Sequence, residues 1–99
     1  MTNKDIVKTI AKAYRYHKHI IYQDENIIET SYRQIQVSKK ICNHIEYVIS
    51  GLDDKYRVIL ENDVIEGLID KKFKDGISQS TYYRNRDKAY ELFIKELNN

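Results

Sequence analysis

The chain of 99 residues contains no proline and only three glycines. These residues interrupt regular backbone most strongly, because proline lacks an N–H group and glycine loses the most freedom when it is ordered. Long stretches can therefore run as uninterrupted helix. No Asn-Gly or Asp-Gly pair stands between alternating apolar residues, the strongest short-range signal of a β-hairpin. The sequence predicts an all-α fold.

Cysteine and long apolar runs are also scarce. Cys42 is the single cysteine, so it forms no intrachain disulfide, and it lacks the spaced Cys and His partners of a zinc site. We expect it to be a small buried apolar residue. No apolar run approaches the roughly 20 residues that cross a bilayer, and the N-terminus carries no signal-like apolar segment. We therefore expect a cytoplasmic protein with no membrane partner.

The usual sequence marks of an enzyme are missing. His17, His19 and His44 do not form a metal-ligand pattern, since the first two point to different helix faces. The sequence has no Gly-rich phosphate loop and no nucleophile elbow. A helical domain of this length has little volume for an active-site cleft. We expect a protein that is not an enzyme and binds no cofactor.

Apolar residues recur at spacings of three and four along most of the chain, which predicts amphipathic helices around one core. We expect one domain of four to five helices, in which residues 1–50 form an antiparallel brace for residues 51–99. The first helix is expected to start at a Thr2–Asp5 capping pair and to end at about Gln23, and the second to stop at Gly51. The third is expected to be capped by Asp53 and to end near Gly67, and a short basic helix that carries Leu68, Ile69 and Phe73 to be closed by Gly76. The last helix is expected to be capped by Ser78. The residues predicted to face the core are, on the first helix, Ile6, Ile10, Ala13, Tyr14, His17 and Ile21; on the second, Tyr32, Ile35, Ile41 or Cys42, Ile45, Val48 and Ile49; on the third, Tyr56, Ile59, Leu60 and Val64; and on the last, Tyr82, Ala89, Leu92 or Phe93, and Leu97.

Charge is distributed unevenly although the total is only +2. Residues 1–19 hold five basic side chains and one acidic, residues 20–70 hold five and ten, and residues 71–99 hold seven and four. A polyanion would be drawn to the two ends and repelled by the middle. Plain solvation of charged helix faces explains the same pattern equally well. The same two interpretations apply to a basic stripe on the first helix: Lys4, Lys8, Lys12, Arg15 and Lys18.

The start of the last predicted helix combines the features of an anion-binding surface. A helix start offers unpaired N–H groups and the positive end of the helix dipole, which favour a phosphate. Arginine forks onto guanine and glutamine onto adenine in the major groove, while hydroxyl and lysine side chains bind phosphates. Gly76 suits a turn between two helices. The candidate DNA contacts are Ser78, Gln79, Ser80, Tyr83, Arg84 and Lys88, with Lys72 and Lys74 in the basic segment before them.

Residues 50–97 resemble a known family. "LDDKYRVILENDVI", a short basic segment and "GISQSTYYRNRDKAYELFIKEL", above all "SQSTYYRNRDKA", are similar to the ArpU-type phage transcriptional regulators and related small proteins of low-GC bacteria and mollicutes. These resemble the promoter-reading fourth region of bacterial sigma factors, a helix-turn-helix. The resemblance implies a recognition helix at about residues 79–97 in the major groove. By analogy Tyr82 and Ala89 pack inward, and DNA is faced by Gln79, Ser80, Thr81, Tyr83 and Arg84.

The chain departs from a full sigma factor in two respects. It has no recognisable region for reading the promoter −10 element or for binding core polymerase, and "EGLIDKKFKDG" is not the usual alanine-containing first helix of the motif. We predict a sequence-specific, double-stranded-DNA-binding transcriptional regulator. The alternative is a protein-interaction adaptor, for example one that binds RNA polymerase through the acidic, Tyr-rich middle. The prediction also allows a homodimer, because dimeric DNA-binding proteins of this kind bind two half-sites about one helical turn apart.

Overall fold

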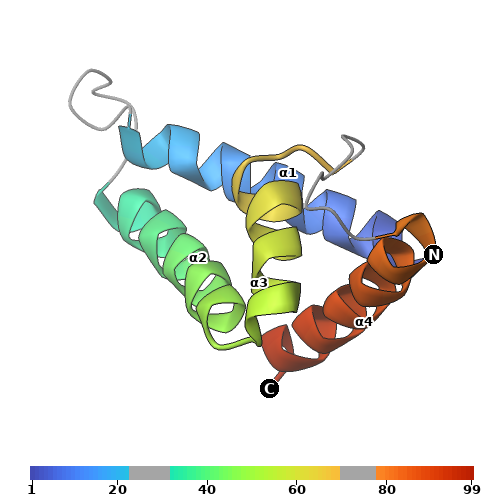
Figure 1. The fold of residues 1–99 in the computed structure, drawn as a ribbon. Helices are drawn as coiled ribbons and strands as arrows, with labels where there is room; N and C mark the ends of the chain where they lie inside the picture. Colours follow the sequence, from blue (N-terminus) through green and yellow to red (C-terminus); the bar gives the residue numbers. More distant parts are fainter. Residues whose placement is uncertain (23–31, 70–77) are drawn as a thin grey trace.

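Four helices carry the part of the chain that the computed structural model describes, residues 1–22, 32–69 and 78–99 (Figure 1). They are α1 (Asn3–Tyr22), α2 (Tyr32–Ser50), α3 (Asp54–Leu60) and α4 (Gln79–Leu97). The end of α3 runs directly into a π-helical turn, η1 (Glu61–Ile65). Over these ranges no β-strand occurs, and the predicted compact all-α fold is confirmed.

Helix α1 packs against α2, η1 and α4. Figure 1 shows α2 and α4 converging toward the C-terminus with α3 between them, and α3 contacts both. One core joins all four helices. Its buried apolar members are Val7, Ala11, Tyr14, Cys42, Ile45, Val48, Ile49, Ile59, Leu60, Val64, Ala89, Tyr90 and Phe93.

Two of the three predicted caps have the predicted side-chain bonds. The Thr2 N–H donates to Asp5 Oδ2 at 3.2 Å and the Asp5 N–H donates to Thr2 Oγ1 at 3.1 Å, so the pair satisfies two donors at the start of α1. At α4 the Thr81 N–H donates to Ser78 Oγ at 3.2 Å. Asp53 stands at the cap position of α3, but its side chain makes no capping bond, and its backbone carbonyl accepts from the N–H groups of Tyr56 and Arg57 instead. The expected Asp53 side-chain cap is therefore wrong.

The buried face of α1 includes the predicted Tyr14, but its other buried residues, Val7, Ala11 and Ile20, were not predicted. Val7 and Ala11 are core residues, whereas Ile6, Ala13 and His17 are half-buried at its edges. Both sets recur at spacings of three and four, so periodicity alone does not separate them. The buried face is the one that packs against α2, η1 and α4. Helix α2 follows its prediction except at Tyr32, which begins the helix beyond the core and is exposed.

The prediction of a helix starting at Leu68 is wrong for the residues that can be described. Leu68 and Ile69 lie outside any helix. Gly67 ends the preceding element with a φ of 71°, and the Arg15 guanidinium fills the space that a Cβ there would need. Asn62 then holds the Leu68 backbone: its carbonyl accepts from the Leu68 N–H at 3.0 Å, and its side-chain amide donates to the Leu68 carbonyl at 3.3 Å. The rest of that predicted helix lies in residues 70–77, outside the described part of the chain.

A buried polar pair links η1 to α4. Asp63 and Tyr90 are both almost fully buried, and the Tyr90 hydroxyl donates a hydrogen bond to Asp63 Oδ2. The Asn62 side-chain amide donates to the other Asp63 oxygen at 2.9 Å. Burial first, and then the bond to Asp63 and its negative charge, raise the pKa of Tyr90 well above its ordinary value. Because the buried carboxylate is hydrogen-bonded, the pair can fix α4 against η1 without an unsatisfied charge.

Candidate functional site

The first turns of α4 stand free of the core. Ser78, Gln79, Ser80, Tyr83 and Arg84 are exposed. Ser80 and Arg84 are four residues apart and lie on the side of the helix opposite the buried Ala89 and Phe93, whereas Gln79 and Tyr83 lie nearer the side of the buried Tyr90. The predicted exposure of these residues is confirmed, but the predicted position opposite the buried stripe is confirmed only for Ser80 and Arg84. Contact with DNA stays a prediction for each of them.

The remaining candidates divide into two groups. Thr81 is half-buried, and its N–H and hydroxyl both bond to Ser78, so it belongs to the cap. Lys88 is exposed one turn beyond Arg84, with Nζ 3.6 Å from Glu91 Oε1. Lys72 and Lys74 lie outside the described residues, as does the turn expected at Gly76.

Arg84 and Arg86 differ in what they touch. Among the described residues no side chain forms a hydrogen bond or ion pair with Arg84. Arg86 is mostly buried, pairs with Asp87 at 3.3 Å, and lies against the rings of Tyr83 and Tyr90. The donors of Arg84 are therefore available to an anion, whereas Arg86 is part of the packing.

The two tyrosines also divide as predicted. Tyr82 is half-buried and packs on the core, while Tyr83 remains 40 % exposed. Their rings meet edge to face, with centroids 5.5 Å apart. The Tyr83 hydroxyl has no hydrogen-bond partner in the described residues, so it can still donate to a phosphate or a base.

The basic stripe predicted on α1 is only partly open. Lys18 is engaged by Glu46, and Lys4 and Lys8 are half-buried and already have interaction partners. Lys12 and Arg15 are exposed. In Figure 1 the N-terminus lies beside the start of α4, and the two helices are in contact. Of the five predicted cations, Lys12 and Arg15 are the two whose residues are exposed.

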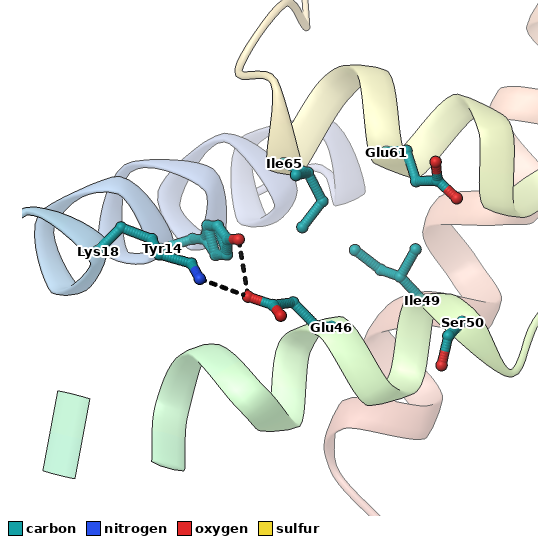
Figure 2. Close-up of a pocket in the computed structure, with 7 residues that line it drawn as sticks. All are labelled: Tyr14, Lys18, Glu46, Ile49, Ser50, Glu61 and Ile65. Atoms are coloured by element: carbon teal, nitrogen blue, oxygen red, sulfur yellow. Dashed lines mark hydrogen bonds and ion pairs between the residues drawn. The ribbon is translucent and has the colours of Figure 1, made fainter. Parts of the chain in front are cut away.

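An open pocket of about 280 Å³ lies between α1, α2 and η1. Figure 2 shows Tyr14 and Lys18 reaching from α1 to the same carboxylate oxygen of Glu46 on α2. The Tyr14 hydroxyl donates to Glu46 Oε2 at 2.8 Å, and Lys18 Nζ lies 3.0 Å from that oxygen. The polar groups of this pocket thus serve mainly to join the two helices.

The Tyr14–Lys18–Glu46 cluster predicts a measurable pH dependence of stability. Burial raises the pKa of Glu46, but the hydrogen bonds from Lys18 and Tyr14 and the charge of Lys18 together hold it below its ordinary 4.5. A carboxylate with a lowered pKa stabilises the fold above its ordinary pKa, and this contribution is lost as pH falls through the lowered value. Because Glu46 is 40 % exposed, we expect Glu46→Gln to cost only about 0.5–1 kcal/mol near pH 7.

Urea unfolding at pH 7, 5 and 3.5 checks this. The gap in free energy of unfolding between wild type and Glu46→Gln should narrow as pH falls below 4.5, the ordinary pKa of the group. The matched control is Glu96→Gln, an exposed change on α4 that should leave stability nearly unchanged throughout. A gap for Glu46→Gln that widens in acid would contradict the assigned role.

Among residues 1–22, 32–69 and 78–99, no three His, Cys, Asp or Glu side chains gather where they could hold a metal ion. None of the helices in these ranges combines the length and the apolar character needed to span a membrane. No protein-family model, curated protein or solved structure matches this chain.

Proposed function

We propose that this protein is a sequence-specific DNA-binding regulator of transcription that places the start of α4 in the major groove. The observation that carries the proposal is the state of that helix start: a capped first turn, exposed polar side chains, and Arg84 exposed with no partner among the described residues. The helix dipole adds a partial positive charge at the same end. These features suit a polyanion better than an apolar partner.

The fold also supports a rigid presentation of α4. Ala89, Tyr90 and Phe93 are buried on one side of the helix, and Tyr90 is hydrogen-bonded to Asp63 in η1. A recognition helix has to hold its base contacts in register, which requires that its other face be anchored. The proposed role in transcription control is supported by the similarity of "SQSTYYRNRDKA" to ArpU-type regulators and to the fourth region of sigma factors.

The connection between the helices differs from a minimal helix-turn-helix. Residues 66–78 separate η1 from α4, whereas the motif usually has a turn of three or four residues. Helix α3 nevertheless packs directly against α4. We therefore propose a helix-turn-helix-like arrangement in which α3 supports α4 through a longer connection.

Retention on duplex DNA as a function of salt tests the proposal. Each phosphate contact contributes roughly −0.9 to the slope of log K against log salt concentration. If Arg84, Lys88 and Lys12 lie near the DNA phosphates, the slope should be about −3 or steeper. The protein should also bind one duplex from a random-sequence pool more tightly than the others. A protein-interaction adaptor would pass through a duplex column at about 50 mM salt and fail to enrich any sequence.

A further inference from the structure

Tyr83 is exposed, yet two neighbours fix its ring. The Arg86 guanidinium carbon lies 4.8 Å from the centroid of the Tyr83 ring, and the Tyr82 ring meets it edge to face. Arg86 also lies 5.7 Å from the centroid of Tyr90, which is itself buried and bonded to Asp63. Residues 83, 86 and 90 follow one another at spacings of three and four, so their side chains stack along one helix face. A chain of contacts thus runs from the buried carboxylate of η1 to an exposed aromatic ring.

Arg86 is poorly placed to contact a ligand itself. Its side chain is 20 % exposed and its Nη2 pairs with Asp87. Its Nε is buried and has no hydrogen-bond partner within the described part of the chain. The guanidinium is therefore held mainly by the two aromatic faces, an arrangement that arginine favours over lysine because its planar group stacks.

We infer that Arg86 is a positioning residue, which fixes the Tyr83 ring so that the unpartnered Tyr83 hydroxyl is already aimed outward before a ligand binds. The inference rests on the proposed function, because it takes the Tyr83 surface as the DNA contact. A side chain that is ordered in advance does not lose that rotational freedom on binding, and this saving corresponds to roughly a 3- to 10-fold gain in affinity.

The first test uses the free full-length protein and needs no DNA. Arg86→Met keeps most of the stem and removes the guanidinium, and Arg86→Lys keeps a cation over the rings. Three-bond couplings from NMR report whether Tyr83 occupies one χ1 rotamer. We expect one rotamer in wild type, averaging among rotamers in Arg86→Met, and partial recovery in Arg86→Lys, with melting curves confirming that each variant is folded. A single Tyr83 rotamer in folded Arg86→Met would overturn the inference. If Arg86→Met does not fold, Arg86→Gln takes its place.

The second test is a double-mutant cycle with the duplex selected from the random pool. Arg86→Met should weaken binding roughly 3- to 10-fold in the wild-type background and less than about 2-fold in a Tyr83→Ala background, because Arg86 then has no ring to position. An equal loss in both backgrounds would mean that Arg86 acts on DNA directly or through the fold, and the inference would fail. If no duplex binds at all, the proposed function falls, while the rotamer measurement still decides whether Arg86 orders Tyr83.

Discussion

Tyr90→Phe is expected to lower the free energy of unfolding by about 2–3 kcal/mol at neutral pH, although it removes one oxygen atom. Asp63 is fully buried in η1, and the Tyr90 hydroxyl is a hydrogen-bond donor to it. Phenylalanine fills the same space but leaves a buried carboxylate oxygen without that donor. The cost therefore comes from a buried charged group that loses one hydrogen bond and not from a cavity.

Urea unfolding of wild type and two variants measures this effect. Tyr83→Phe is the matched control, since it removes the same atom from the same helix at an exposed position where the hydroxyl has no described partner. It should change stability by less than about 0.5 kcal/mol. Equal effects of the two substitutions would show that the Asp63–Tyr90 pair does not anchor α4.

Arg84→Ala is expected to weaken binding to the selected duplex by about 1–3 kcal/mol, roughly 5- to 150-fold, if its guanidinium forks onto a guanine. The reason is the exposed, unpaired state of Arg84 among the described residues, which leaves all its donors free for one ligand. The affinity for non-cognate duplexes should fall much less, so the sequence preference should relax at one base position.

Two controls distinguish sequence-specific base recognition by Arg84 from general electrostatic attraction to DNA. Lys12→Ala removes an exposed cation of α1 and should weaken all duplexes alike, with a salt slope reduced by about one. Arg84→Ala should leave the melting temperature unchanged, because Arg84 makes no described hydrogen bond or ion pair. Unchanged affinity of Arg84→Ala for the selected duplex would remove this residue from the reading role.

Local rules were sufficient for the caps at Thr2 and Ser78 and for the exposure of the first residues of α4. The caps at Thr2 and Ser78 involve residues three apart, so the sequence shows both partners of each bond. The division between Tyr82 and Tyr83 follows from their position relative to Ala89 and Phe93 on the same helix. These features depend on spacing within one element.

Features that depend on the partner element could not be predicted in the same way. Asp63 and Tyr90 are 27 residues apart, and no local pattern indicates that a carboxylate in a π-helical turn will meet a tyrosine on another helix. The buried face of α1 depends on the close approach of neighbouring elements to Val7 and Ala11. The contact of Arg86 with Tyr83 and Tyr90 had a visible signal, because these tyrosines lie three and four residues from it on the same helix.

The most direct measurement is amide-resolved NMR of the full-length protein while a short duplex from the selected pool is added. Binding through the amino end of α4 predicts that the backbone amides of residues 78–84 shift first and most, with smaller changes near Lys12 and none around the Glu46 pocket. Shifts centred on the Glu46 pocket or on the outer face of α2, with residues 78–84 unchanged, would contradict the account.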